Sequence, residues 1–198
     1  MSNDFTSAIR PAVVMTILFA LLLGIGYPLA MTGIGQAIFP SQANGSLIEQ
    51  NGRVIGSSVV GQAFASDRYF QTRPSAAGKG YDGLNSSGSN LGPASQALVD
   101  RVKPDIAKRQ AEGVTGAMPA DLVTASASGL DPDLSPAAAL AQVPRVARVR
   151  GLPIAVVRPL VEANVEHALF GVLGDDHVDV LALNRALDAY DRKGAAPR

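Results

Sequence analysis

The chain has 198 residues, with 17 basic side chains, 17 acidic side chains, two histidines and no cysteine. The balanced charge provides no overall field toward nucleic acid, so the sequence predicts no nucleic-acid partner. The absence of cysteine excludes disulfides and thiolate metal sites, and two histidines leave little for a histidine-based one, so no metal site is predicted.

The first predicted element is a transmembrane helix over residues 12–34, since no charged residue lies between Arg10 and Glu49. Its 23 residues would extend roughly 35 Å, enough to cross a hydrocarbon layer of about 30 Å. A cleaved secretory signal is the alternative, with an apolar core over residues 12–23 and a cleavage site near Ala30. The retained anchor is favoured because apolar residues continue to Phe39.

Charge beside this helix predicts its orientation. Arg10 lies next to one end, whereas no basic residue follows the other end until Arg53. The positive-inside rule then predicts a cytoplasmic N-terminus over residues 1–11 and an extracytoplasmic domain over residues 41–198. Pro28 is expected to kink the helix or end its first part. Small residues allow another helix to approach closely, and the candidates for such packing are Gly24, Gly26 and Ala30.

The remaining chain predicts a mixed domain. Asn51-Gly52 between apolar residues indicates a β-hairpin. Residues 67–93 read as a linker or an ordered loop, and their aromatic residues favour order. Helices are expected over residues 93–112, with a kink at Pro104, and from Ser135 as N-cap toward Arg150, interrupted by Pro144.

Two further elements are expected near the C-terminus. Residues 153–168 predict a helix containing Pro159, and residues 177–190 predict a short strand or turn entering a helix with Leu183, Leu187 and Tyr190 on one face. The predicted fold class is therefore α+β: a single N-terminal transmembrane helix followed by one mixed, helix-rich extracytoplasmic domain with a β-hairpin.

The stretch "TASASGLDPDLSP", residues 124–136, is the main candidate for chemistry. Asp131 could act as a nucleophile or general base together with Asp121 or Asp133, which would make the protein a membrane-tethered extracytoplasmic enzyme. Asp-Pro before a helix is also what a turn requires, and the local spacing favours this structural interpretation. No basic or carboxylate partner for Asp131 is visible nearby in the sequence.

Two basic features invite a phosphate-binding interpretation. Gly78-Lys79 fails as a P-loop, because Arg73 and Gly80 occupy the positions that need Gly and Ser or Thr. Four arginines between residues 145 and 158 could bind a phosphate or an acidic partner, which would allow a nucleotide-binding regulator. They could equally pair with acidic residues elsewhere in the fold.

Several motifs in this order and spacing give the chain a family resemblance: "GYP" (26–28), "GQAF" (61–64), "YFQTRPSA" (69–76), "YD" (81–82), "SGSNLGP" (87–93), "PADLVTASASGLDPDLSPAAALAQVPRVARVRGL" (119–152) and "VLALNRALD" (180–188). The chain resembles the C subunit of the bacterial Kdp-type potassium-transporting ATPase over nearly its full length. Pro104 and Pro159 depart from the family pattern, because they fall in stretches that are usually uninterrupted helix.

The resemblance implies a non-catalytic subunit of an ATP-driven potassium import complex, single-pass in the bacterial inner membrane. Its implied partners are a P-type ATPase B subunit, a channel-like potassium-binding A subunit and a small F subunit, besides the lipid bilayer. The family is described as a catalytic chaperone that raises the ATP affinity of the hydrolysing subunit, so ATP would act through that subunit. The signature and loop residues implied are Arg73, Pro74, Ser75, Asn90, Gly92, Ser126, Ser128, Gly129, Asp131, Pro132, Gln142 and Arg145.

Overall fold

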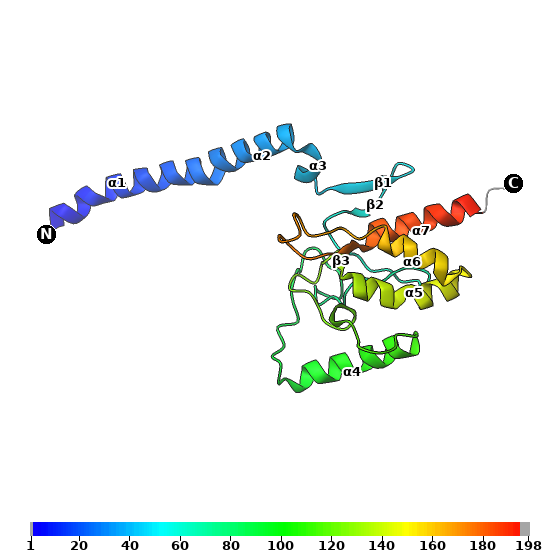
Figure 1. The fold of residues 1–198 in the computed structure, drawn as a ribbon. Coiled ribbons are helices and arrows are strands. Elements are labelled where there is room, and N and C mark those ends of the chain that lie inside the picture. Colours follow the sequence, from blue (N-terminus) through cyan, green and yellow to red (C-terminus); the bar gives the residue numbers. More distant parts are fainter. Residues whose placement is uncertain (1, 195–198) are drawn as a thin grey trace. The chain divides into compact units, whose positions relative to one another are not determined.

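The computed structural model describes residues 2–194, which form two compact units (Figure 1). The first unit ends at Leu47 and the second begins at Ile48. The first contains the apolar helical run that the hydropathy pattern predicts, and the second contains the mixed helices and strands.

The first unit is a nearly continuous helical run. Its elements are α1 (Ser2–Leu21), a π-helical turn η1 (Leu22–Gly26), α2 (Tyr27–Ile38) and, after Phe39, the short α3 (Pro40–Ala43). In the π turn the Tyr27 N–H donates to the Leu22 carbonyl, five residues back. Pro28 follows at once, and a wider turn is a common way for a helix to accommodate a residue that lacks an N–H. Pro28 therefore does not end the helix.

Among the described residues, one helix is long and apolar enough to cross a membrane. It runs over Thr6–Ile38, 33 residues whose most apolar 18-residue stretch has a mean hydropathy of 2.2, and none of that stretch is buried within the chain. At 1.5 Å per residue it would extend roughly 50 Å. It therefore continues beyond the predicted limits of residues 12 and 34 at both ends.

The second unit is mixed and helix-rich. Its hairpin is formed by β1 (Leu47–Gln50) and β2 (Arg53–Ser57), and a second two-stranded pair by β3 (Asp133–Leu134) and β4 (Val178–Asp179). Its helices are α4 (Gln96–Ala111), the 3-10 turn η2 (Ala120–Leu122), α5 (Pro136–Arg150), α6 (Ile154–Glu162) and α7 (Val180–Gly194). The predicted combination of helices with a hairpin is confirmed.

The turn of the hairpin is the one that its sequence predicts. Asn51 has φ 53° and Gly52 has φ 73°, the two left-handed residues of a type I′ turn. The second strand pair joins distant parts of the chain in antiparallel register, with Asp133 opposite Asp179 and Leu134 opposite Val178. This pairing ties the end of the 124–136 stretch to the start of α7.

The hydrophobic core lies around α5, where α5 packs on α6 and α6 packs on α7. Burial of these apolar faces is the main stabilising contribution of the domain, at about 25 cal/mol per Å². The fully buried side chains include Phe70, Leu122, Val143, Val146, Val157, Val161, Leu183 and Leu187. Of the three residues predicted on one face of α7, Leu183 and Leu187 are fully buried, whereas Tyr190 is 42% exposed.

Prolines interrupt these helices less than the sequence predicts. The Ser135 side chain accepts from the Ala138 N–H at 3.2 Å, which confirms the predicted N-cap of α5. The predicted break at Pro144 is wrong, because α5 continues to Arg150 and ends at Gly151 with the two hydrogen bonds of a Schellman motif. The helix α4 contains Pro104, the position of the predicted kink, and continues beyond it to Ala111. Packing of each helix's apolar face outweighs the loss of one hydrogen bond.

The helix predicted over residues 153–168 ends early. It contains Pro159 but stops at Glu162, where the Asn164 side chain donates to the Leu160 carbonyl at 2.7 Å. The following residues instead bridge to a returning strand, with Glu166 opposite His177 and Leu169 opposite Leu173. The prediction of helix over residues 163–168 is therefore wrong.

The segment 67–73 enters the interior at Phe70 and Thr72, which are buried, although residues 61–95 contain no helix or strand. Two side-chain amides pair its backbone as neighbouring strands would. Gln142 accepts from the Gln71 N–H at 2.9 Å and donates to the Gln71 carbonyl at 3.0 Å. Asn184 does the same for Phe70, at 2.8 and 2.9 Å. The sequence-based preference for order in this region is confirmed.

Two guanidinium groups of α5 bind the same segment. Arg145, which is almost fully buried, donates to the carbonyls of Asp67 and Tyr69 at 2.6 and 3.1 Å. Arg150 donates to the Arg68 carbonyl at 2.7 Å and lies over the Tyr69 ring, 4.9 Å from its centroid. Each guanidinium thus satisfies carbonyls that no strand pairs.

We expect replacement of Gln142 by Leu to lower the free energy of unfolding by about 3 kcal/mol or more. The substitution conserves volume but leaves the Gln71 N–H and carbonyl buried without partners, at about 1–3 kcal/mol for each group. Thermal and denaturant unfolding of the purified chain measure the change. Gln110→Leu, at an exposed position of α4, is the matched control, with an expected change within about 0.5 kcal/mol. Equal effects of both substitutions would contradict this role of Gln142.

Candidate functional site

The stretch 124–136 folds as an ordered loop whose own serines hold its shape. The Ser126 hydroxyl accepts from the Gly129 N–H at 2.9 Å, and the Ser128 hydroxyl accepts from the Leu130 N–H at 3.1 Å. Gly129 has φ +66°, a conformation that favours glycine. We call residues 124–136 the signature loop.

A second segment, residues 73–88, lies against the signature loop. The Ser75 hydroxyl donates to the Gly129 carbonyl at 2.6 Å and accepts from the Tyr81 N–H at 2.7 Å. The Ser128 carbonyl accepts from the Ser86 hydroxyl at 3.0 Å and from the Ser87 N–H at 2.9 Å. A Cβ added at Gly129 would lie 2.6 Å from both the Ala77 nitrogen and the Ser87 oxygen. The two segments therefore touch backbone to backbone.

Asp131 has the partner that the sequence did not reveal. The Arg73 guanidinium, 58 residues away along the chain, donates to Asp131 Oδ2 at 3.1 Å. The same guanidinium reaches the carbonyls of Thr124 and Ala125, each at 3.4 Å. The other Asp131 oxygen accepts from the Asp133 N–H at 3.1 Å. The partner of Asp131 therefore comes from a distant segment, and none is nearby in the sequence.

The other two candidate carboxylates have separate environments. Asp121 accepts from the Ser135 N–H at 2.8 Å, directly before α5. Asp133 is half-buried, and this burial raises its pKa, assisted by the negative charges of Asp131 and Asp179. Asp131 and Asp121 accept hydrogen bonds from loop N–H groups, as turns and helix starts require.

The remaining predicted loop residues are distributed unevenly. The Pro132 carbonyl accepts from the Val180 N–H at 3.1 Å, which ties the loop to α7. Asn90 is exposed, with φ 50°, and the Gly92 carbonyl accepts from Ser95 N–H ahead of α4. Neither residue has a recorded hydrogen bond to the signature loop. Gly88 approaches it instead, since a Cβ there would lie 3.0 Å from the Ala127 oxygen.

Gln142 and Arg145 belong to a second, buried polar cluster. Arg145 donates to the Gln142 side chain at 2.7 Å and pairs with Glu112, 3.4 Å away. Arg109 reaches the same Glu112 at 3.0 Å and the Gln71 side chain at 2.8 Å. Burial lowers the pKa of Arg145, and Glu112 opposes this effect. These groups hold segment 67–73 in place.

The arginines between residues 145 and 158 therefore divide into buried and exposed side chains. Arg145 and Arg150 are buried and paired with acidic residues, Arg150 with Asp188 at 2.9 Å and Asp191 at 2.6 Å. Arg148 is exposed and reaches the Glu112 carbonyl at 3.5 Å. The alternative in which these arginines pair within the fold holds for Arg145 and Arg150.

A polar cavity of about 380 Å³ lies beside the segment 73–88. Arg73, Pro74 and Ser75 line one side of it, and Lys108 and Arg109 of α4 line another. Tyr81 also lines the cavity, and its hydroxyl bonds to the Thr72 hydroxyl and donates to the Arg73 carbonyl. Burial raises the pKa of the Tyr81 phenol. The Arg73 and Arg109 guanidiniums are paired within the protein, so the cavity wall is already neutralised in part.

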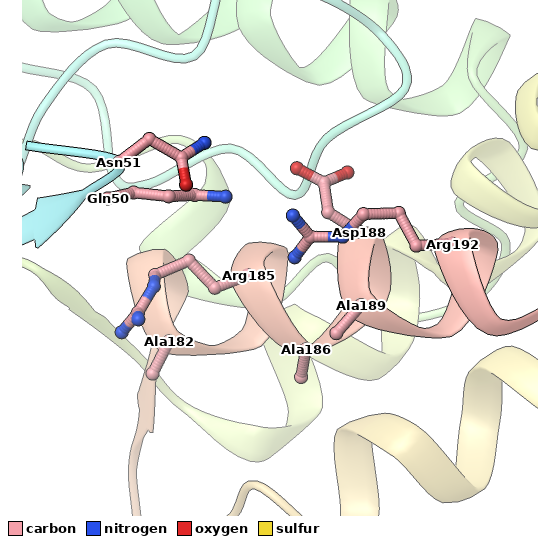
Figure 2. Close-up of a pocket in the computed structure, with 8 residues that line it drawn as sticks. All are labelled: Gln50, Asn51, Ala182, Arg185, Ala186, Asp188, Ala189 and Arg192. Carbon is pink, nitrogen blue, oxygen red and sulfur yellow. The ribbon is translucent and has the colours of Figure 1, made fainter. Parts of the chain in front are cut away.

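A larger cavity, of about 500 Å³, lies between the β1–β2 turn and α7. Figure 2 shows the Arg192 side chain extending back along the helix toward Gln50, while Arg185 points away to the other side. Asp188 lines the cavity too, but it is bound to Arg150 and to the Tyr69 hydroxyl. The arrangement presents one extended guanidinium rather than a converging set of charges.

Other predicted positions lie outside these clusters. Gly24 and Gly26 fall in the π turn and Ala30 in α2, all three exposed within their own unit. Over residues 2–194, no group of three or more His, Asp or Glu side chains is placed to hold a metal ion. Sequence reasoning missed Gln71, Asn184 and Glu112. Only the motif strings around Gln71 and Asn184 pointed toward them, without indicating a role.

Comparison with known proteins gives one consistent result. The family model described as "K+-transporting ATPase, c chain" (KdpC) matches residues 9–189. The potassium-transporting ATPase KdpC subunit of Caulobacter vibrioides is 56% identical over 184 residues, covering 92% of this chain and 93% of its own. That of Bradyrhizobium diazoefficiens is 53% identical, covering 91% and 96%. That of Acidobacterium capsulatum is 55% identical, covering 91% and 97%. The matched region includes both polar clusters.

Two glycines with the same backbone conformation test the close contact at the signature loop. Gly151→Ala, at φ +68° with no atom within 4 Å of the added Cβ, should cost about 1 kcal/mol of backbone strain. Gly129→Ala, at φ +66°, should cost about 3 kcal/mol or more, because overpacking adds to the same strain. Thermal unfolding of both variants provides the comparison. Equal losses would show that the two segments can separate without cost.

Proposed function

The chain belongs to the KdpC family and is therefore a subunit of a potassium-transporting ATPase, within which we propose that it acts as a non-catalytic assembly and activity subunit. The observation that carries the proposal is the family match over residues 9–189 combined with a loop whose carboxylates accept hydrogen bonds from the chain itself. The proposed partners are the P-type ATPase B subunit, the channel-like potassium-binding A subunit and the small F subunit.

The proposed location is the bacterial inner membrane, with residues 12–34 crossing it once. The apolar helix over Thr6–Ile38 supports a single crossing. Arg10 beside its first end supports a cytoplasmic N-terminus and an extracytoplasmic domain over residues 41–198. Gly24, Gly26 and Ala30 are proposed to let a helix of another subunit approach closely.

ATP is proposed to act through the hydrolysing subunit rather than by contact with this chain. An extracytoplasmic domain is separated from cytosolic ATP by the membrane. A catalytic-chaperone effect on ATP affinity would then be a coupling transmitted through the complex, in which binding of one component changes the affinity of another. The signature loop and the segment 73–88 are proposed as a rigid docking surface for that coupling.

Replacement of Asp131 tests the non-catalytic role against an enzyme that uses this carboxylate. We expect Asp131→Asn to lower the free energy of unfolding by about 1 kcal/mol, since a partly exposed ion pair and a turn hydrogen bond are weakened. Potassium uptake should be retained in a strain that lacks the native subunit. Asp100→Asn, at an exposed position of α4, is the control and should change neither quantity. Loss of uptake with unchanged stability and unchanged binding to the other pump subunits would indicate chemistry at Asp131.

Labelling of an introduced cysteine tests the proposed topology. The chain contains no cysteine of its own, so no other residue of the chain would be labelled. Lys103→Cys, at an exposed position of α4 outside the proposed docking surface, should react with a membrane-impermeant thiol reagent in cells whose outer layer is permeable to the reagent. Ser7→Cys, ahead of the apolar stretch, should react only after lysis. Reversed labelling would place the domain in the cytoplasm and overturn the proposed separation from ATP.

A further inference from the structure

The hairpin that follows α6 carries a cluster of exposed hydrophobic side chains at its tip. Leu169 and Leu173 bridge the two sides, and their backbone groups exchange hydrogen bonds of 3.0 Å in each direction. The exposed fractions are 60% for Leu169, 85% for Phe170, 78% for Val172 and 60% for Leu173. Single exposed hydrophobic residues are ordinary, but four within five positions form a patch of the kind that marks an interaction site. We call residues 169–173 the apolar tip.

The backbone conformation of the apolar tip is one that does not favour phenylalanine at position 170. Phe170 has φ 56° and Gly171 has φ 71°, nearly the same pair as Asn51 (53°) and Gly52 (73°) in the first hairpin. That first turn uses Asn-Gly, the preferred pair for this geometry, whereas Phe is unfavourable at a left-handed position. Its ring also gains nothing from packing inside the domain. Such unfavourable positions concentrate where a side chain serves binding.

The surroundings of the apolar tip are acidic. Between Arg158 and Arg185 the chain has five acidic residues and no lysine or arginine. Glu166, Asp175 and Asp176 lie exposed at the base of the hairpin. Asp176 accepts from the Ala168 N–H at 3.0 Å and bonds to His167 at 2.9 Å, contacts that lower its pKa and keep it charged. Three carboxylates and two histidines therefore lie at the base of the apolar tip, with Asp176 beside His167 and Glu166 beside His177, and no lysine or arginine accompanies them in this part of the chain.

This combination favours a protein over a lipid surface. Segments that insert into the membrane interface carry lysine and arginine beside their apolar residues, because anionic lipids attract them. The excess of carboxylates at the base of this hairpin would instead be repelled there. A protein recess that is apolar at its centre and basic at its rim complements both parts of the hairpin.

We propose that the apolar tip inserts Phe170 into an apolar recess with a basic rim on another subunit of the pump. The proposal rests on the proposed function, because that function supplies the partner. A protruding aromatic side chain that fills a pocket is the usual form of an interface hot spot. The apolar tip would then be an anchoring contact separate from the signature loop.

Phe170→Asn separates folding from binding, because Asn is the better residue for this turn. The thermal midpoint of the full chain in detergent should stay the same or rise. Its affinity for a detergent-solubilised complex of the remaining pump subunits should fall about tenfold or more, as for loss of a hot-spot side chain. Val59→Asn, which removes a side chain that is 60% exposed and lies outside both the apolar tip and the proposed docking surface, is the control and should leave the affinity unchanged. Unchanged affinity for Phe170→Asn would overturn the proposal.

A photoreactive amino acid at position 170 of the full chain, in membranes containing the whole pump, identifies the occupant. A crosslink to another pump subunit supports the proposal, whereas a crosslink to phospholipid, to a second copy of this chain or to nothing overturns it. Association of the unsubstituted chain with the other subunits tests the proposed function separately. If that chain fails to associate with the other subunits, the proposed function fails; if it associates and position 170 gives no subunit crosslink, only the apolar tip is wrong.

Discussion

Buried backbone N–H and C=O groups must be paired, and in this domain that requirement falls on a segment with no strand beside it. Gln142 of α5 and Asn184 of α7 each bind both backbone groups of one residue in segment 67–73. Their amides therefore link two helices through an irregular segment. Phe70 enters the core as a consequence, and Arg73 emerges at the position where it meets Asp131. The signature loop depends on this placement.

The functional proposal follows from how the polar side chains are used. Asp131 is paired with Arg73, Ser75 with the Gly129 carbonyl, and Arg145 with carbonyls of segment 67–73. In an active site, side chains of this kind would remain available to a substrate. Here they fix two loops against each other. A rigid surface of loops suits the proposed role of a subunit that positions its partners.

The sequence predicted those features that depend on local patterns. The apolar helix, the Asn51-Gly52 hairpin and the Ser135 cap each follow from neighbouring residues, and all three are present. The break at Pro144 was wrong because packing of α5 in the core outweighs one lost hydrogen bond. The Arg73–Asp131 pair could not be predicted, since it joins residues 58 positions apart through an irregular segment. The spacing of residues along the sequence does not reveal contacts between side chains so far apart.

Hydrogen exchange at the backbone amides of Phe70 and Gln71 tests most directly whether side-chain amides hold this segment as firmly as a strand would. Exchange reports the free energy of the opening that exposes each amide. If Gln142 and Asn184 act as described, both amides should exchange as slowly as those of the buried turns of α5 and α7, through global unfolding of the domain. Exchange at the rate of an exposed loop such as residues 83–86 would contradict the account.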